Sequence, residues 1–574
     1  MFFAEPGAVL DVVGLPRDDS WLAGWRARVE RAAARLAWTG MKTAVRRHAG
    51  GVLLAISAPS DQLFLATEVN EWAVCATLAE QDPTTRSLLE RALADADPEA
   101  VLAPVIEETA AFARFGKLQA MEANPALRAL LDAAAARSLP YTADETELTL
   151  GSGAGSRNYA LAALPDPPSV SWAELSSIPT AIVTGSNGKT TTVRLLAACA
   201  RAHGWRTGYN CTDGVFIDDE ALARGDYSGP AGARLVMRAA GTQAAILETA
   251  RGGILRRGLA VSHADTAVVT NISSDHFGEY GIDDLSGLAD VKLSVAAVLG
   301  STGLLVLNAD DSVLCSQADR LAQRFGRMPP LGWFALDDDE ALLRAHRLHG
   351  GWTCGVRQGR LRLSCRGESH DLGSIATMPL SIGGLAAYNI ANLAAAALAA
   401  GALGIPAPTI ADVFARFGET ARDNPGRMMR YEVAGVRVLI DYAHNPDGLR
   451  GLLSVADALR GGRGRLGLLL GHAGNRKDSD IEALARVAAE FHPDLIVVKE
   501  NEAQLRGRAP GEVPAIIRRE LLRLGLPDSA LPMCDSEFEA ARYALQWARP
   551  GDVLALPLHA LGARAAVVAL LETP

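Results

Sequence analysis

Residues 183–193 limit this chain to folds in which a strand runs through a tight glycine turn into a helix. The segment reads V-T-G-S-N-G-K-T-T-T-V, follows apolar strand-forming residues and continues into a helical apolar pattern. A strand, a glycine turn, a Lys-Thr pair and a helix together indicate a phosphate-binding loop. In such a loop, main-chain N–H groups and the helix N-terminus face phosphate oxygens. Lys189 then reaches the β- and γ-phosphates, and the Thr190 hydroxyl can bind Mg²⁺.

A tight turn without a ligand is the alternative, but it leaves the Lys-Thr pair without a packing role. The loop is a shortened variant, since the general pattern has a glycine where Val183 stands. Its form, T-G-S-N-G-K-T-T, resembles the ATP loop of the Mur ligase superfamily. Members of that superfamily phosphorylate a carboxylate with ATP and then let an amine attack the acyl phosphate. The resemblance implies ATP and Mg²⁺ as cofactors, and ATP contacts for Gly185, Ser186, Asn187, Gly188, Lys189, Thr190 and Thr191.

Composition narrows the partners and the compartment. Acidic residues outnumber basic ones, with a net charge of −10, which argues against nucleic acid as a partner. The first ten residues lack a basic region followed by an apolar core, and no uncharged apolar run reaches membrane-spanning length. Seven cysteines without a C-x-x-C pair indicate thiols rather than disulfides. We therefore expect a cytoplasmic protein that does not bind membranes, and the sequence leaves open whether it forms a homo-oligomer.

The length of 574 residues predicts about three domains. A P-D-P-P linker at 165–168 separates an α+β domain over 1–165 from a second domain over 170–425. In the second domain strands alternate with helices, which predicts an α/β fold with a parallel sheet. The alternating stretch 352–366 predicts a hairpin in a small antiparallel subdomain. Residues 426–574 predict a smaller Rossmann-like α/β domain, which lacks the G-x-G-x-x-G opening of a dinucleotide site.

Several polar residues follow the ends of predicted strands, where ligands bind in parallel sheets. Glu248, in L-E-T-A-R-G-G, suits Mg²⁺ coordination beside a phosphate loop. A lone histidine is usually structural, but His276 follows a strand in S-S-D-H-F-G, and we favour a metal role. Arg427 follows Pro-Gly at the second domain boundary and suits a phosphate clamp. Asp441, in D-Y-A-H-N-P, either binds ribose hydroxyls or is a turn residue.

Two further signals are ambiguous by themselves. Asn389 and Asn392 lie one helical turn apart, so their amides face one way, either toward a ligand or as an exposed polar stripe. Lys292 would be an ordinary helix-surface residue. However, the chain contains only six lysines against fifty arginines, so each retained lysine hints at a need for a compact amine.

Taken in order, these residues resemble the active site of the Mur ligase superfamily over nearly all of 170–560. The resemblance implies that Glu248 and His276 bind metal and that Lys292 matches the lysine which many members carbamylate to hold a second Mg²⁺. It also implies catalytic or metal-binding roles for Lys189, Thr190 and Arg427. The remaining implied nucleotide contacts are the adenine-contacting asparagines Asn389 and Asn392, in a motif where Tyr388 replaces the usual histidine, together with Arg427 and Asp441.

Three segments more narrowly resemble the Mur-type half of the cyanophycin synthetases. They are L-E-T-A-R-G-G-I-L-R-R-G-L, T-D-G-V-F-I and R-G-R-A-P-G-E-V. In those enzymes an ATP-grasp domain precedes the Mur half. About 165 residues precede the linker here, too few for that domain as well, so we expect its second ligase activity to be absent. Residues 57–72 resemble the N-terminal domain of the same enzymes, which predicts that the first domain holds the acceptor.

The resemblance therefore predicts an ADP-forming ligase that joins an amino acid to a carboxylate of an aspartyl or peptide acceptor. Arg476 and Lys477, in G-H-A-G-N-R-K-D-S-D, could bind the donor carboxylate or the acyl phosphate; a solvated basic turn is the alternative. A basic donor such as arginine would need acidic partners, for which loops of the third domain offer Asp478, Asp480, Glu500 and Glu502.

Two other functions remain open at this stage. The chain could be a folylpolyglutamate-type or muramyl-peptide-type ligase, which would share the same ATP chemistry. It could instead be a nucleotide-binding partner subunit of a separate ligase. The presence of Lys189, Glu248 and His276 argues against this second alternative, because a subunit without catalysis has no need of them.

Overall fold

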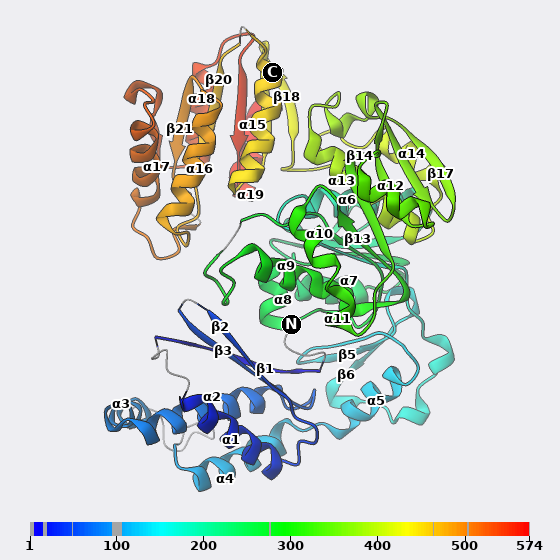
Figure 1. Ribbon diagram of the computed structural model, residues 1–574, viewed down its shortest axis with the longest axis vertical. Helices are drawn as coiled ribbons and strands as arrows, with labels where there is room; N and C mark the ends of the chain where they lie inside the picture. Colours follow the sequence, from blue (N-terminus) through cyan, green and yellow to red (C-terminus); the bar gives the residue numbers. More distant parts are fainter. Residues whose placement is uncertain are drawn as a thin grey trace. The chain divides into compact units, whose positions relative to one another are not determined.

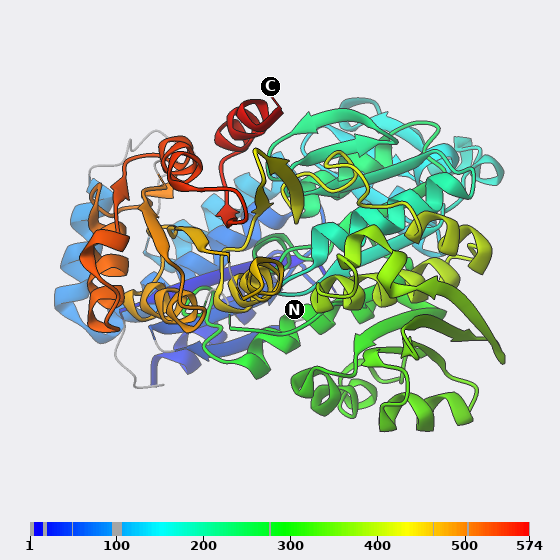
Figure 2. The same cartoon turned by 90° about the horizontal axis from the view of Figure 1, so that it is seen from above.

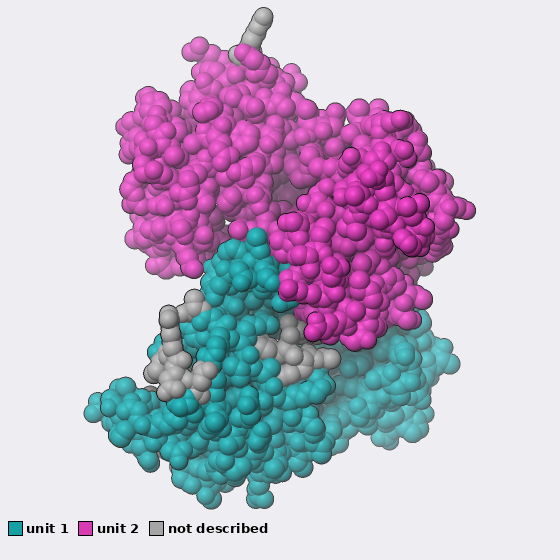
Figure 3. Space-filling view, in the orientation of Figure 1, with its two compact units in different colours: residues 1–177, 251–262, 277–297 teal, residues 178–250, 263–276, 298–574 magenta. Residues whose placement is uncertain are grey.

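The computed structural model describes residues 5–14, 20–48, 50–94, 106–274, 277–462, 464–501 and 504–572. These residues form two compact units (Figure 3). The first comprises residues 1–177 together with two later segments, 251–262 and 277–297, and the second comprises the rest. The two later segments lie between central-sheet strands in the sequence, yet they pack with the N-terminal part. The predicted division into three domains stays a prediction.

The first unit is built on an antiparallel sheet with strand order β1-β3-β2 (Figure 1). Its central strand β3 (Gly51–Ser57) is the apolar run G-V-L-L-A-I-S, and it pairs with β1 (Gly7–Val13) and β2 (Thr43–His48). Helices α1 (Ser20–Arg35) and α2 (Leu63–Gln81) bury their apolar faces in the core beside this sheet. The expected α+β character of this region follows from that arrangement.

A second small antiparallel sheet and further helices complete the first unit. Residues Glu147 to Ala160 form two of its strands around the turn G-S-G-A-G-S. The elements are α3 (Pro83–Ala94), α4 (Glu108–Glu122), α5 (Pro125–Ala135), β4 (Tyr141–Ala143), β5 (Glu147–Leu150), β6 (Arg157–Ala160), α8 (Arg251–Arg257) and α9 (Leu285–Leu293).

The second unit contains a central sheet with eleven strands among the described residues, in the order β10-β9-β8-β11-β7-β12-β13-β14-β15-β16-β17. The neighbouring strands β8, β11, β7, β12, β13, β14 and β15 run parallel. Antiparallel strands extend the sheet at both edges, β9 and β10 beside β8, and β16 and β17 beside β15. The bounds are β7 (Thr180–Thr184), β8 (Thr207–Cys211), β9 (Gly214–Ile217), β10 (Glu220–Arg224), β11 (Ala244–Glu248), β12 (Ala264–Val269), β13 (Leu299–Asn308), β14 (Leu331–Asp337), β15 (Trp352–Arg357), β16 (Arg360–Cys365) and β17 (Glu368–Ser374).

Helix α6 (Lys189–Ala202), which follows the glycine loop, packs against the alanine-rich helix α13 (Ala387–Ala402) in the central core. Alanine side chains let the two helix backbones approach closely, which brings the start of α13 beside the loop. The remaining helices of this region are α7 (Pro230–Arg238), α10 (Ser312–Ala318), α11 (Leu321–Phe325), α12 (Ala341–Leu348) and α14 (Ala407–Phe414).

The C-terminal sheet has the order β18-β19-β23-β20-β21-β22 within the described residues. All its strands are parallel except the edge strand β18. Two separate cores, one on each face, are covered by helices (Figures 1 and 2). The elements are β18 (Met429–Val433), β19 (Val436–Asp441), α15 (Pro446–Arg460), β20 (Leu466–Leu470), α16 (Asp478–Glu490), β21 (Leu495–Lys499), α17 (Glu512–Arg523), β22 (Met533–Cys534), α18 (Glu537–Trp547), β23 (Val553–Pro557) and α19 (Leu561–Glu572).

The α/β fold predicted from the sequence is confirmed, with one correction. Residues 352–366 do form an antiparallel hairpin, but they do not form a separate subdomain. Strand β15 pairs in parallel with β14, a strand that the sequence pattern did not indicate, so the hairpin extends the central sheet. Within the described residues, no helix combines the length and the apolar character needed to cross a membrane.

Candidate active site

The glycine loop follows the buried central strand β7 and adopts a backbone that only glycine tolerates well. Gly185 has φ +144° and Gly188 has φ +83°, both in the region where a side chain is strained. A Cβ on Gly185 would lie 1.8 Å from Thr270 Oγ1, and one on Gly188 would lie 2.2 Å from Asn392 Oδ1. Both glycines are therefore required by conformation and by the close approach of neighbouring side chains.

The end of strand β12 holds the loop in place. Asn187 N donates to Asn271 Oδ1 at 2.9 Å, and Asn271 Nδ2 donates back to the Asn187 carbonyl at 3.1 Å. Thr270 Oγ1 donates to the same carbonyl at 2.5 Å. Lys189 Nζ donates to the Ser186 carbonyl at 3.0 Å, so the lysine lies folded along the loop. The loop is thus fixed by hydrogen bonds before any phosphate is considered.

Glu248 ends strand β11 and lies fully buried against the start of α6. Thr190 Oγ1 donates to Glu248 Oε2 at 2.8 Å, and Thr212 Oγ1 lies 3.4 Å from Oε1. Burial raises the pKa of Glu248, although Lys189 and the Thr190 hydroxyl favour its ionised form. A hydroxyl and a carboxylate side by side are the protein ligands that Mg²⁺ takes when phosphates and waters complete its shell.

The described residues contain no group of three or more His, Cys, Asp or Glu side chains placed to hold a metal ion. The donor set at Thr190 and Glu248 nevertheless fits Mg²⁺, because that ion usually binds protein through only one or two carboxylates. His276, the predicted second metal ligand, lies outside the described residues. Lys292 is buried on α9 rather than exposed, so it is not an ordinary surface residue. It belongs to the first unit, whereas Glu248 belongs to the second.

Arg427 reaches from the domain linker to the start of the loop helix. Its guanidinium lies 4.3 Å from the ring centroid of Tyr442, a cation–π distance, and Nη2 lies 3.4 Å from Thr190 Oγ1. The aromatic ring therefore supports a cation beside the hydroxyl that Glu248 also contacts. Lys189, Thr190, Glu248 and Arg427 thus gather at one end of α6.

A buried charged cluster holds that linker, and sequence reasoning missed it. Arg194 donates from Nη1 to Asn424 Oδ1 at 3.1 Å and to the Pro425 carbonyl at 2.8 Å. Arg194 Nη2 pairs with the Asp213 carboxylate, which Arg564 Nη2 also contacts at 3.0 Å. Burial opposes ionisation of Asp213, but the arginines outweigh it and lower its pKa. The T-D-G-V-F-I segment was the available signal for Asp213.

The two predicted asparagines are buried, so the interpretation as an exposed polar stripe is wrong. Asn392 Nδ2 donates to Asn389 Oδ1 at 3.2 Å, and Asn389 Nδ2 donates to the Leu380 carbonyl at 3.1 Å. Thr192 Oγ1 of the loop helix donates to Asn392 Oδ1 at 3.4 Å. A polar path therefore runs from α6 through both amides to residue 380.

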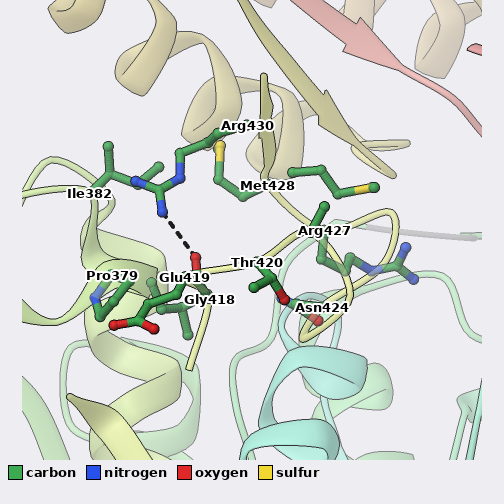
Figure 4. Close-up of a pocket in the computed structure, with 12 residues that line it drawn as sticks. Pro379, Ile382, Gly418, Glu419, Thr420, Asn424, Arg427, Met428 and Arg430 are labelled. Carbon is green, nitrogen blue, oxygen red and sulfur yellow. Dashed lines mark hydrogen bonds between the residues drawn. The ribbon is translucent and has the colours of Figure 1, made fainter. Parts of the chain in front are cut away.

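A pocket opens beside that path, lined by residues of the segments 379–382 and 418–430 (Figure 4). Arg430 Nη2 donates to the Gly418 carbonyl across it at 2.9 Å, while the Arg427 guanidinium points away from Arg430. Two of its lining residues contact the phosphate loop: Arg427 reaches Thr190 Oγ1, and Asn424 Nδ2 donates to Thr191 Oγ1 at 3.2 Å. It is therefore a concave site that adjoins the phosphate loop.

Asp441 ends β19 and uses both carboxylate oxygens on main-chain donors. Oδ1 accepts from Ala443 N at 2.8 Å, and Oδ2 accepts from Met428 N at 2.7 Å. Burial raises its pKa, against the effect of Arg427 and these N–H groups. The bond to Ala443 is the local turn contact of the alternative interpretation, and the bond to Met428 ties the residue to the pocket. A ribose contact stays a prediction.

The predicted substrate residues Arg476 and Lys477 precede α16, the arginine buried and the lysine exposed. Asp478, which follows them, pairs with Arg508 at 2.7 Å. Glu500 accepts from Asn501 N and Gly511 N. These two carboxylates therefore already have internal partners, while Glu502 lies outside the described residues.

Comparisons with known proteins agree with this geometry. The Mur ligase middle domain matches residues 183–400, and the Mur ligase, glutamate ligase domain matches residues 426–556. The chain therefore belongs to the Mur ligase family of acid–amino acid ligases. This confirms the resemblance found in the sequence.

Two curated relatives and one solved structure illustrate the likeness. Cyanophycin synthetase of Synechocystis sp. is 35% identical over 383 residues, covering 67% of this chain and 42% of that protein. UDP-N-acetylmuramoyl-L-alanyl-D-glutamate–2,6-diaminopimelate ligase of Alkalilimnicola ehrlichii is 30% identical, covering 65% and 69%. The chain thus spans less than half the length of that cyanophycin synthetase. The structure of E. coli FolC with DHPP and ADP shares the fold, with a TM-score of 0.50 and 20% identity, covering 69% of this chain and 88% of that one.

Proposed function

We propose that this chain is an ADP-forming amide ligase that joins an amino acid to a carboxylate of an aspartyl or peptide acceptor. The observation that carries the proposal is the cluster of Lys189, Thr190, Glu248 and Arg427 at the start of α6. It combines two cations, a hydroxyl and a carboxylate beside a glycine loop. These are the groups needed to bind a nucleoside triphosphate with a divalent cation.

In this proposal, each part of ATP is assigned to residues of the second unit. Its phosphates lie on residues 185–191, and its adenine enters the pocket lined by 379–382 and 418–430. Asn392 accepts from Thr192 of the loop helix, and Asn389 donates to the carbonyl of Leu380 in the pocket wall. Asp441 accepts a hydrogen bond from the main-chain N–H of Met428, also in the pocket wall. Mg²⁺, when bound by Thr190 and Glu248, neutralises charge on the phosphates. Lys292 and His276 are proposed for a second ion.

The residues of the chain then promote phosphoryl transfer mainly by position and charge. Lys189 and Arg427 offset the negative charge that spreads over the transferring phosphoryl group. The loop N–H groups hold the remaining phosphates through the geometry that Gly185 and Gly188 permit. The acceptor carboxylate becomes an acyl phosphate, and the donor amine displaces phosphate from it. One ATP is converted to ADP and phosphate for each amide bond.

The acceptor and donor are proposed from the likeness to cyanophycin synthetases. The 35% identity supports a related aspartyl acceptor, with the first unit holding it. Arg476 and Lys477 stand at the carboxyl edge of the C-terminal sheet and are proposed for the donor carboxylate or the acyl phosphate. A muramyl-peptide-type reaction is the second candidate, because a diaminopimelate ligase matches over more than two thirds of its own length. A folylpolyglutamate-type ligase is a further alternative.

A product screen tests the proposal. The purified chain is incubated with ATP, Mg²⁺, each amino acid in turn and short aspartyl peptides, and products are read by mass spectrometry together with phosphate release. We expect phosphate release that requires both acceptor and donor and that falls about 10²–10³-fold in Lys189→Ala. Lys117→Ala, an exposed lysine on α4, is the matched control. Turnover only with muramyl or folyl substrates would move the assignment within the family, and nucleotide binding without any product would favour the partner-subunit alternative.

A further inference from the structure

A fully buried lysine stands at the carboxyl edge of the C-terminal sheet, outside the groups used above. Lys499 ends β21, pairs with the Glu537 carboxylate at the start of α18, and lies 3.5 Å from His559 Nδ1. Glu537 also accepts from the main-chain N–H groups of His559 at 3.1 Å and Ala560 at 2.9 Å. Gly471, which follows the neighbouring strand β20, leaves the required space, since a Cβ there would lie 2.9 Å from Lys499 Cγ.

The charges of this network are balanced inside the domain. Burial opposes ionisation of Glu537, but Lys499 and His559 outweigh it and lower the Glu537 pKa. Burial and the neighbouring Lys499 lower the pKa of His559, which favours the neutral imidazole. Burial also lowers the pKa of Lys499, against the effect of the Glu537 carboxylate, so a buried amine faces a carboxylate and an imidazole here. This uses the compact amine of a lysine in a chain that otherwise prefers arginine.

The second nitrogen of His559 contacts the D-Y-A-H-N-P loop. His559 Nε2 lies 3.2 Å from the Ala443 carbonyl, and a carbonyl only accepts. The ring therefore carries a proton on Nε2, while its Nδ1 lies 3.3 Å from Glu537 Oε1 and 3.5 Å from Lys499 Nζ. Lys499 and Glu537 on one side and the Ala443 carbonyl on the other thus fix the orientation of the ring.

The same loop reaches the glycine loop of the central sheet. Asn445 Nδ2 donates to Asn187 Oδ1 at 3.0 Å, and Asn445 Oδ1 accepts from Gly448 N at 2.8 Å. Ala443, which His559 contacts, lies between Asp441 and Asn445 and donates to the Asp441 carboxylate. A path of hydrogen bonds and short chain segments therefore connects His559 to a residue of the phosphate loop.

We propose that His559, oriented by Lys499 and Glu537, is a positioning residue for nucleotide binding. It holds the 441–446 loop so that Asn445 stays on Asn187 and Asp441 stays beside the pocket. The inference rests on the proposed nucleotide site but not on the identity of either substrate. The polar groups of the network contact one another and the main chain.

Two substitutions of the same histidine separate positioning from simple packing. A glutamine amide reaches the place of Nε2 and can donate to Ala443, whereas an asparagine amide reaches only the place of Nδ1. Affinity for a non-hydrolysable ATP analogue with Mg²⁺ is measured by calorimetry on the full chain. We expect His559→Asn to weaken binding about five- to tenfold and His559→Gln to stay within about twofold, as expected for one hydrogen bond.

A carboxylate at the opposite edge of the same sheet provides the control. Asp552 is buried and pairs with Arg465 at 2.6 Å, so Asp552→Asn weakens a buried polar contact at the other end of strand β23. This variant is expected to lose stability but keep its affinity for the analogue. Thermal unfolding shows which variants are folded. Should His559→Asn not fold, Asn445→Ala removes the other end of the path and is expected to weaken binding similarly.

The outcomes are distinct. Non-additive losses in the double variant His559→Asn/Asn445→Ala would support a shared path. Equal affinities of the Asn and Gln variants, wild-type affinity in His559→Asn, or fully additive losses would overturn the proposal. Wild-type protein that binds the analogue but forms no amide would end the proposed ligase function and leave the inference standing. Wild-type protein that binds no nucleotide would overturn both.

Discussion

The two parallel sheets of the second unit both present polar residues at their carboxyl edges, but they use them differently. At the central sheet, the chain after β7 is a glycine loop, and the side chains of Lys189 and Glu248 gather around it. At the C-terminal sheet, Lys499, Glu537 and His559 saturate one another inside the domain. The first edge is the proposed nucleotide site, and the second is proposed to hold a loop.

The two carboxyl edges differ in which of their polar groups stay available to a ligand. Glycine removes side chains and frees backbone donors, which are then available to phosphate. A buried ion pair satisfies its own donors and acceptors and has little capacity left for a ligand. The loop 441–446 connects the two edges, because it contacts His559 at Ala443 and the glycine loop at Asn445.

The largest expected effect is on stability at the C-terminal edge. Glu537→Gln leaves Lys499 buried without a countercharge, so we expect a loss of about 3–5 kcal/mol in the free energy of unfolding. Denaturant unfolding measures this value. The double variant Lys499→Met/Glu537→Gln should recover most of the loss. A double variant as unstable as the single one would show that packing rather than charge maintains this edge.

At the central edge the expected loss is catalytic. Lys189→Ala removes a cation from the transferring phosphoryl group, and we expect kcat/KM to fall about 10²–10³-fold. The free energy of unfolding should change by less than about 1 kcal/mol, because the lysine contributes only one hydrogen bond to the loop. Steady-state kinetics with the substrates found in the product screen, beside chemical unfolding, separate the two quantities. Loss of stability without loss of rate would reverse the comparison.

Lys292 tests whether the catalytic edge depends on a second ion. If the lysine holds that ion as a carbamate, Lys292→Ala should lower kcat about 100-fold or more, since metal ions stabilise transition-state charge by several kcal/mol. Partial recovery in bicarbonate with a short-chain carboxylic acid would indicate a carbamate. Full activity of the variant would remove this role. Lys117→Ala again serves as the unrelated lysine.

A smaller effect is expected where the two edges meet. The ring of Tyr442 supports the Arg427 guanidinium at 4.3 Å, so Tyr442→Leu should raise KM for ATP about two- to tenfold through loss of the cation–π contact. Tyr442→Phe retains the ring face and should behave like the wild type. An equal defect in both variants would assign the contribution to the hydroxyl instead.

The smallest predicted effect is on pH dependence. The pKa of His559 is lowered in the folded chain, so the unfolded chain binds a proton first as pH falls through the ordinary histidine value of about 6.5. Stability should therefore decline with acidification from about pH 6.5, and His559→Gln should lack this part of the decline. Chemical unfolding between pH 7.5 and 5 measures both proteins. Parallel pH profiles would show that the histidine does not titrate in this range.

Much of the second unit was predictable because its elements are local apolar runs. Residues 466–470, the apolar run L-G-L-L-L, form the buried strand β20, and residues 495–499 form the buried strand β21. The edge strand β10 was not indicated by the sequence, because an edge strand needs few apolar residues and takes its register from its neighbour β9. The pairing, rather than the local sequence, decides such strands.

The sequence by itself determined the glycine loop, since Gly185, Gly188 and the Lys-Thr pair are adjacent and their chemistry depends on local backbone geometry. Only the tertiary structure decided which distant groups meet there. Asp213 joins Arg564 across 351 positions, and Asn187 joins Asn445 across 258. The burial of Lys499 beside Glu537 could not be predicted from the sequence either, because the residues around a lysine at a strand end do not indicate whether it faces water or a carboxylate. Neighbouring residues determine local conformation, whereas burial and long-range pairing arise only when separate elements pack together.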